Sequence, residues 1–249
     1  MPRHARMQSE SGIYHVMLRG IDRREIFMDG EDYETFLELL ERYKAECGFK
    51  LYAYCLMRNH VHLLMKVEEE GLDKILKRIS VAFVYRFNLK YRRCGHLFQD
   101  RFRSEAVEDD GYFLTALRYI LQNPVKAGIC DSPEKYPYSS MQAYLGKKDR
   151  LTDTGYAAEI CGAQELVRFL LEPNEDQCLE ITESAQSGMS DGLAKELVRQ
   201  TLGATPSTTK ESREALAQKI RELNRKGISV RQISRISGIS KGIVERCLK

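Results

Sequence analysis

The chain has 249 residues, of which 43% are hydrophobic and 30% are charged, a composition typical of a globular protein that buries a core. No apolar run approaches the roughly 18 residues that a membrane helix needs. The N-terminal residues also lack the apolar segment of a signal peptide, so we expect a cytoplasmic protein. The seven cysteines are scattered and never form a C-x-x-C pair, which favours free thiols over disulfides or a zinc site.

Local patterns in the first half of the chain predict alternating strands and helices. In chain order, the predicted elements are a strand at 12–20, a helix at 31–48, strands at 49–57 and 60–67, a helix at 71–91, an extended segment at 95–109 and a helix at 111–128. Arg58 and Asn59 form the turn of a predicted hairpin. The last helix is expected to end near Asn123, because Pro124 disfavours helical geometry in the residue before it.

This order of elements is that of the ferredoxin-like folds. The sequence therefore predicts an α+β protein with an antiparallel sheet and helices on one face of that sheet. Such a sheet would leave its other face free for a functional site.

Charge separates the rest of the chain into two further parts. The net charge of +3 is made of +3 over residues 1–150, −7 over 151–204 and +7 over 205–249. We expect an acidic helical segment that ends in a linker of small and polar residues at 203–212. The basic tail is expected to be a separate module that binds a polyanion, with a merely solvated surface as the alternative.

The basic tail has the pattern of a helix-turn-helix. Its apolar positions are Ile233, Ile236, Ile239 and Val244, and Gly238 falls at the turn. If residues 240–249 form a recognition helix, its basic side chains are expected to meet a DNA groove. A small helical dimerisation module is the alternative.

His60 and His62 stand in the second strand of the predicted hairpin. Residues two apart in a strand share a face, so both imidazoles are expected on one side of the sheet. Two neighbouring imidazoles can chelate a divalent cation. Two histidines on a wet sheet surface are the alternative.

Tyr119 and Asn123 are four residues apart on the last predicted helix of this part, and therefore share a face. Tyrosine can act as a covalent nucleophile, and an amide oxygen can bind a metal. A core tyrosine with an asparagine near the helix end is the alternative. Taken together, the two pairs indicate a metal with a nucleophile beside it, which can cut a phosphodiester without water and keep the bond as a phosphotyrosine.

Longer blocks around these residues resemble a known family. The segment NHVHLLM resembles the His-hydrophobic-His motif of the HUH endonuclease superfamily. YHVMLRGIDRREIF, GHLFQDRFRS and YILQNPVKAG are similar to blocks of the single-tyrosine transposases, and most similar to the branch called REP-associated tyrosine transposases. The resemblance covers residues 10–145 and implies a catalytic domain over 1–150, with the acidic segment at 151–204 and the helix-turn-helix module at 205–249 outside it.

The resemblance also implies the chemistry. Tyr119 is at the position of the nucleophile, and His60, His62 and Asn123 are at the positions of the ligands to Mg²⁺ or Mn²⁺. The implied substrate is single-stranded DNA, often folded as a hairpin. The relatives include monomers and dimers, so a homodimer stays open. Leu121 stands where relatives often carry a polar residue, which puts in doubt an auxiliary proton-transfer role there.

Basic residues that can hold phosphates or enter a groove are the candidate DNA contacts. They are Arg19, Arg23, Arg24, Arg101, Arg103 and Arg118, and, in the tail, Arg231, Arg235, Lys241 and Arg246. Solvated charges or ion pairs are the alternative for each. His15 is expected to be a core or DNA-contacting histidine, and Tyr112 is the rival nucleophile.

Two other functions compete with an enzyme. A DNA-binding regulator without catalysis would have no use for the nucleophile. A ferredoxin-like RNA-binding module would carry stacking aromatic residues on its central strands, where this chain has imidazoles.

Overall fold

The computed structural model describes residues 8–99, 101–174, 176, 178, 191–202, 210–226, 228 and 230–248. The chain divides into two compact units, Met1–Glu180 and Ile181–Lys249. None of the helices in the described ranges is both long enough and apolar enough to cross a bilayer.

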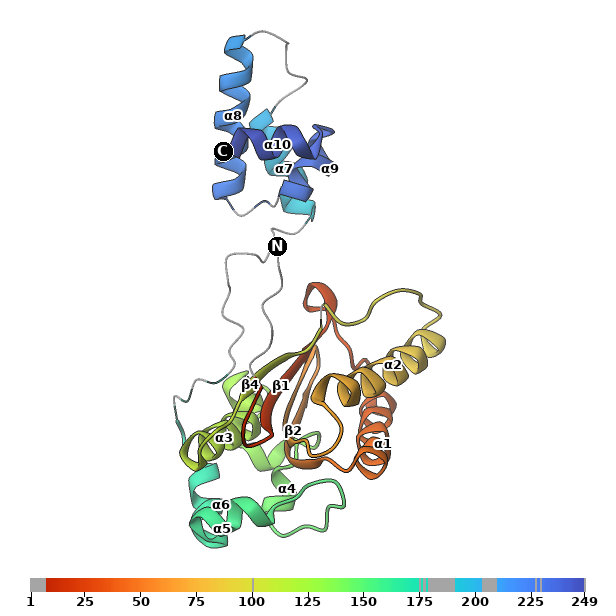
Figure 1. Cartoon of the computed structure of the whole chain (residues 1–249), viewed down its shortest axis with the longest axis vertical. Coiled ribbons are helices and arrows are strands. Elements are labelled where there is room, and N and C mark those ends of the chain that lie inside the picture. The colour runs from red at the N-terminus through yellow and green to blue at the C-terminus, as the bar shows by residue number, and fades with distance from the viewer. Residues whose placement is uncertain are drawn as a thin grey trace. The chain divides into compact units, whose positions relative to one another are not determined.

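The first unit is built on a four-stranded antiparallel sheet (Figure 1). Its strands are β1 (Ile13–Arg19), β2 (Lys50–Met57), β3 (His60–Lys66) and β4 (Arg103–Ala106), in the spatial order β2-β3-β1-β4. The turn at residues 58–59 joins β2 to β3, as predicted. The strand β4 occupies only four residues of the segment 95–109 that was predicted to be extended.

Helices cover both faces of this sheet. In Figure 1, α1 (Gly30–Cys47) and α2 (Leu72–Lys90) lie on one side of the sheet and α3 (Asp110–Lys126) lies on the other. The prediction that helices occupy one face is therefore wrong. The reason is visible in the strands, whose side chains are apolar on both sides: Leu63 packs into the core beneath α1 and α2, and Leu64 packs into a second core beneath α3.

Short helices extend the second core. They are α4 (Met141–Tyr144), α5 (Gly155–Cys161) and α6 (Ala163–Leu171). The 3-10 turn η2 (Pro133–Lys135) precedes α4, and another 3-10 turn, η1 (Ile21–Arg23), follows β1. Leu166 and Leu170 of α6 are buried in the core that α3 forms with the sheet. The domain boundary predicted at residue 150 therefore falls inside the first unit, because the acidic segment begins with two helices, α5 and α6, whose apolar side chains complete this core.

The helix α3 continues through Pro124 to Lys126, so its predicted end near Asn123 is wrong. Proline lacks an N–H, but its fixed φ is compatible with a helix. The end is set instead by Gly128, which has a φ of +67°. Its N–H donates to the Val125 carbonyl and the N–H of Ile129 donates to the Pro124 carbonyl, both at 2.9 Å. This is the Schellman arrangement that a glycine favours.

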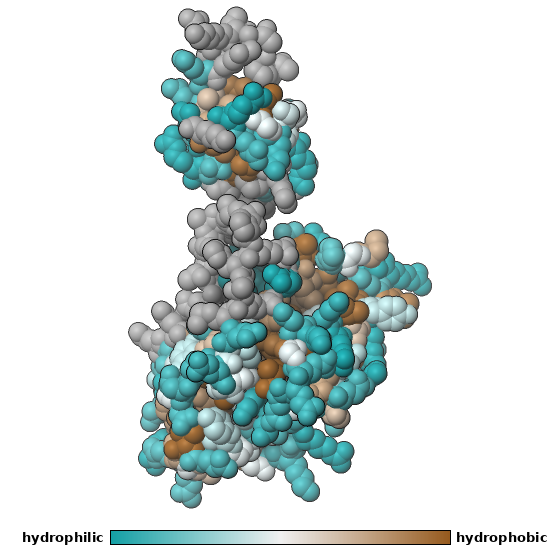
Figure 2. Space-filling model, viewed as in Figure 1, coloured by the Kyte–Doolittle hydropathy of each residue, from teal (hydrophilic) through white to brown (hydrophobic). Residues whose placement is uncertain are grey.

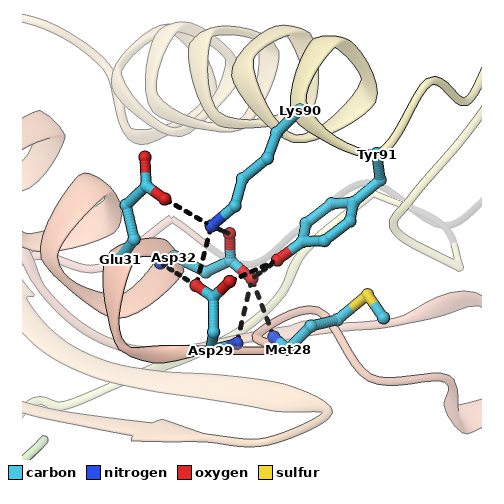
Figure 3. Close-up of polar contacts among 6 residues, drawn as sticks. All are labelled: Met28, Asp29, Glu31, Asp32, Lys90 and Tyr91. Carbon is cyan, nitrogen blue, oxygen red and sulfur yellow. Dashed lines mark hydrogen bonds and ion pairs between the residues drawn. The ribbon is translucent and has the colours of Figure 1, made fainter.

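A network of charged groups ties the start of α1 to the end of α2 (Figure 3). Asp29 caps α1, and the buried Asp32 side chain accepts from the backbone N–H of Met28 at 2.8 Å. Lys90 Nζ lies 2.7 Å from Asp29 Oδ1 and 3.0 Å from Asp32 Oδ1. The Tyr91 hydroxyl donates to Asp32 Oδ2 at 2.8 Å. These bonds fix how α1 and α2 cross over the sheet.

The surface shown in Figure 2 is largely hydrophilic, with brown side chains along α2. The exposed apolar residues of that helix are Val81, Tyr85 and Leu89, which are 60%, 70% and 71% exposed. Their spacing of four places them along one face of α2.

The second unit is helical. Its helices are α7 (Asp191–Leu202), α8 (Lys210–Arg225), α9 (Val230–Ser237) and α10 (Lys241–Leu248). Of the predicted apolar positions, Ile233 and Val244 are fully buried and Ile236 and Ile239 pack against them. Gly238 has a φ of +72° between α9 and α10, as its place in a turn requires. The predicted linker at 203–212 lies partly outside the described residues, and its last residues belong to α8.

Candidate active site

The hairpin brings its two histidines to the same face of the sheet. His60 pairs with Arg19 of β1, and His62 pairs with Met17 of β1 and Cys55 of β2. The two imidazole centroids are 5.0 Å apart and the rings are nearly perpendicular, at 86°. The alternation of side chains along β3 therefore places the imidazoles as the sequence predicts.

Each imidazole is held through its Nδ1 atom. His60 Nδ1 lies 2.6 Å from Oδ1 of Asn59, the preceding turn residue. His62 Nδ1 lies 2.9 Å from Nε2 of His15 on β1. These bonds orient both rings and leave Nε2 as the nitrogen that can bind a cation.

Tyr119 reaches the same place from the covering helix. Its ring centroid lies 5.8 Å from that of His62 and 5.9 Å from that of His15. The side chain is almost buried, because α3 packs on this face of the sheet. Lys126 Nζ lies 4.9 Å from the centroid of the Tyr119 ring, so a cation stands beside the phenol.

Asn123 lies one turn beyond Tyr119 and forms a hydrogen bond with His60. The structure thus brings together all four residues that the sequence singles out as nucleophile and ligands. The described residues contain no cluster of three or more His, Cys, Asp or Glu side chains able to hold a metal. Two imidazoles and the Asn123 amide nonetheless fit a divalent cation, as a mixed nitrogen and oxygen donor set with open positions.

Burial sets the protonation of the imidazoles. It lowers the pKa of His60 to about 4, an effect that the hydrogen bond to Asn123 opposes and the charge of Arg19 reinforces. It lowers the pKa of His62 well below its usual value, with smaller contributions from His15 and His60. Both rings are therefore neutral at pH 7, the form in which imidazole binds a metal.

The predicted DNA contacts other than Arg118 divide into three groups. Arg19 and Arg103 belong to the site face, since Arg19 pairs with His60 and Arg103 pairs with Met17. Arg23, at the end of η1, and Arg24 and Arg101, on loops of the first unit, are exposed. The predicted contacts of the second unit are Arg235, Lys241 and Arg246, which are exposed, and Arg231, whose side chain lies outside the described part of the structure.

Arg118 is held inside the protein. Its guanidinium donates to the Asp176 carboxylate at 2.7 and 3.0 Å and lies 3.8 Å from the ring centroid of Phe169. The side chain is only 15% exposed. Arg118 thus anchors the chain after α6 against α3, and the structure does not bring it to the site.

Tyr112, the rival nucleophile of the sequence prediction, lies two turns before Tyr119 on α3. Its hydroxyl is hydrogen-bonded to Glu105, and burial together with that bond raises the pKa of Tyr112. Two residues that the sequence analysis did not assign to the site belong to it, His15 and Lys126. Lys126 follows Tyr119 by seven residues, or two helical turns, so the sequence could have placed both on one face of the helix. The position of His15 beside His62 depends on the pairing of β1 with β3, which the sequence does not show.

The class of protein follows from this fold together with the comparison to known families. A family model described as "Transposase IS200 like" matches residues 8–123, a span that begins before β1 and ends at Asn123. A Haemophilus influenzae protein named as a REP-associated tyrosine transposase is 30% identical over 156 residues, which cover 56% of this chain and 85% of that protein. The chain belongs to the family of REP-associated tyrosine transposases, and the resemblance drawn from its sequence blocks is confirmed.

The fold agrees with this family. The solved structure of a REP-associated tyrosine transposase bound to a REP hairpin matches with a TM-score of 0.53 at 17% identity. The match covers 61% of this chain and 94% of the solved chain. At that identity the likeness shows a shared fold.

Proposed function

We propose that this protein cleaves and rejoins single-stranded, hairpin-forming DNA through a covalent bond to Tyr119. The observation that carries the proposal is the 5.8 Å separation between the ring centroids of Tyr119 and His62. The nucleophile comes from α3 and the imidazoles from a strand far earlier in the chain. A phenol placed beside two neutral imidazoles is the constellation needed for phosphoryl transfer to tyrosine.

The reaction exchanges one phosphate ester for another. The Tyr119 hydroxyl attacks phosphorus, its new O–P bond forms as the bond between phosphorus and the 3′ oxygen breaks, and the phenolic proton is lost. The departing 3′ oxygen takes up a proton and becomes a hydroxyl. The 5′-phosphotyrosine retains the ester, so a later 3′-hydroxyl can attack it and reverse the step.

His60, His62 and Asn123 would hold Mg²⁺ or Mn²⁺ in this proposal. When bound, the cation supplies positive charge that polarises the phosphate and stabilises the leaving oxygen. The residues of the chain prepare this site: burial keeps His60 neutral, and Asn59 holds its ring in place through Nδ1.

The first unit would hold the DNA through the arginines around the site. Arg19 and Arg103 are on the same sheet face as the imidazoles, and Arg23, Arg24 and Arg101 are exposed nearby in the chain. Phosphate contacts of this kind set the register of the strand without reading its bases. The hairpin seen with the structurally similar transposase supports a hairpin substrate here.

The second unit would act as a DNA-binding helix-turn-helix, with α10 as the recognition helix. Lys241 forms an exposed pair with Glu245 at 3.3 Å, which DNA phosphates can displace at little cost. The net charge of +7 over residues 205–249 favours a polyanion as the partner.

Covalent capture tests the main proposal. The full chain is incubated with labelled single-stranded hairpins and Mg²⁺, and the protein–DNA adduct is measured on a denaturing gel. Tyr119→Phe is expected to lower adduct formation by on the order of 10³-fold or more, because the attacking oxygen is gone. Hairpin binding by the variant is expected to stay near wild type.

Tyr112→Phe is the matched control, since it removes a hydroxyl from the same helix and is expected to keep the adduct. A wild-type chain that binds hairpins without ever forming an adduct would instead identify a regulator that has lost catalysis. An undiminished adduct in Tyr119→Phe would show that another residue is the nucleophile.

A further inference from the structure

A third histidine lies directly behind the imidazole pair. His15 on β1 is fully buried, and its Nε2 lies 2.9 Å from His62 Nδ1. The His15 ring is 5.2 Å from His62 and 5.9 Å from Tyr119, measured between centroids. No protein partner is present for its Nδ1 in the described structure. An apolar side chain would fill this place without leaving a buried nitrogen unpaired.

The bond between the two histidines has two possible directions. If His15 donates from Nε2, His62 accepts at Nδ1 and must carry its own proton on Nε2. That arrangement blocks Nε2 of His62 as a ligand, because a metal binds the unprotonated nitrogen of a neutral imidazole. If His62 donates from Nδ1, its Nε2 lone pair is free, and His15 carries its proton on Nδ1.

We propose that His15 is the positioning residue of the metal site: it accepts a hydrogen bond from His62 Nδ1 and so fixes the tautomer and the ring orientation in which His62 Nε2 binds a divalent cation. The inference rests on the metal role of His60 and His62 in the proposed function. His15 does not itself ligate, since its Nε2 is used by His62. Asn59 plays the corresponding part for His60, at 2.6 Å.

The position of His15 explains why an imidazole stands on this strand. His15 is paired with Leu64 on β3, the next residue after His62 that points to the same face. A diagonal neighbour on an antiparallel pair is within reach of a long or aromatic side chain but beyond that of a short one. The Nε2 atom of an imidazole reaches His62 from there. A glutamine side chain has a similar length, and its amide oxygen can accept the same hydrogen bond.

Substitutions at residue 15 test the proposal through metal affinity. Mn²⁺ alone is titrated into the full chain, and the dissociation constant is measured by calorimetry or by the resonance of free Mn²⁺. His15→Leu removes the acceptor and is expected to weaken Mn²⁺ binding by about 10–100-fold, the usual loss for a partner of a metal ligand. His15→Gln keeps an acceptor and is expected to recover most of that loss.

His96→Leu is the matched control, because it removes an exposed imidazole from a loop and is expected to leave the affinity unchanged. Equal affinities of His15→Leu and wild type would overturn the inference while leaving the proposed metal site intact. A His15→Gln variant that binds Mn²⁺ as weakly as His15→Leu would also overturn the inference. Unchanged Mn²⁺ binding by a His62→Ala variant would overturn the metal site itself, and the inference with it.

Nitrogen NMR of the wild-type chain tests the same point without a substitution at residue 15. With ¹⁵N-labelled histidine and saturating Mg²⁺, long-range proton–nitrogen correlations report which ring nitrogen carries the proton. Both His15 and His62 are expected to be protonated on Nδ1. A proton on Nε2 of His15 would mean that His15 donates to His62, which contradicts the proposal.

Discussion

At the scale of single residues, the site is a set of polar side chains placed in a buried environment. His15, His60 and His62 are neutral because the sheet and α3 exclude water from them. Neutral imidazoles suit metal binding, but burying them has a consequence for stability. The same groups are ordinary, exposed bases in the unfolded chain.

We expect the metal-free protein to lose stability in mild acid. Burial lowers the pKa of His15 from 6.5 to about 3 and that of His60 to about 4, so between these values and pH 6.5 the unfolded chain binds more protons. The stabilising contribution is therefore present above pH 6.5 and is lost as the pH falls toward 4, by on the order of 1 kcal/mol per pH unit for each such histidine. Urea unfolding in EDTA from pH 7.5 to 5 measures this slope. His60→Gln is expected to flatten it, and the same slope in the variant and the wild type would contradict the prediction.

Lys126 is expected to assist Tyr119. Its Nζ lies 4.9 Å from the ring centroid and is held by the Asp176 carbonyl at 2.6 Å. A fixed cation beside a phenol stabilises the negative charge that develops on its oxygen. Lys126→Met is expected to slow single-turnover adduct formation by about tenfold, an energy of roughly 1.4 kcal/mol. Lys135→Met, which removes an exposed lysine, provides the reference rate. Equal rates of adduct formation in Lys126→Met and Lys135→Met would show that Lys126 does not assist Tyr119.

At the scale of elements, the site depends on how α1, α2 and α3 are anchored to the two faces of the sheet. The strands β2 and β3 are buried on both sides, which holds the imidazole pair rigidly. On the face opposite the site, the carboxylate of Asp32 joins the cap of α1 to the end of α2.

Removing that carboxylate is expected to destabilise the fold without touching the site. Asp32→Ala leaves the Met28 N–H without its partner. It also removes one acceptor each from the Tyr91 hydroxyl and the Lys90 ammonium, which keep Asp29. The expected loss in free energy of unfolding is about 3 kcal/mol, read from the urea midpoint of the first unit. The matched control is Asp131→Ala, which breaks an exposed pair with Lys135 and is expected to cost less than about 1 kcal/mol. Similar midpoints for the two variants would show that the network contributes little.

At the scale of the whole molecule, the chain combines a catalytic unit with a small basic helical unit. The first carries Tyr119 and the imidazoles, and the second carries the excess of positive charge. This division predicts that affinity for DNA and covalent chemistry can be separated by mutation.

Neutralising α10 is expected to weaken DNA binding and to spare the chemistry. In the double variant Lys241→Gln with Arg246→Gln, the slope of log affinity against log salt for hairpin DNA is expected to fall by about 1–2, because each lost phosphate contact removes about 0.9. The adduct formed at saturating DNA is expected to be unchanged. Lys195→Gln with Arg199→Gln removes the same charge from exposed positions on α7 of the same unit and is expected to change the slope less. Equal slopes in the two double variants would show that DNA binding depends on the overall charge of the unit and not on contacts made by α10.

The amino-acid sequence by itself determined the order of the elements, the hairpin with His60 and His62 on one face, and the spacing of Tyr119 and Asn123. These features follow from periods of two residues in a strand and 3.6 in a helix, which are local properties. The blocks around them also identified the family.

Only the tertiary structure decided what meets these residues. In it, α3 packs on the second face of the sheet and Tyr119 lies close to His62. Arg118 forms hydrogen bonds with Asp176, and His15 forms one with His62. Each is a contact between segments far apart in the chain, made by strand pairing and by burial of apolar surface on both faces of the sheet. Local periodicity carries no information on such pairings, so His15 was visible in the sequence while its partner was not.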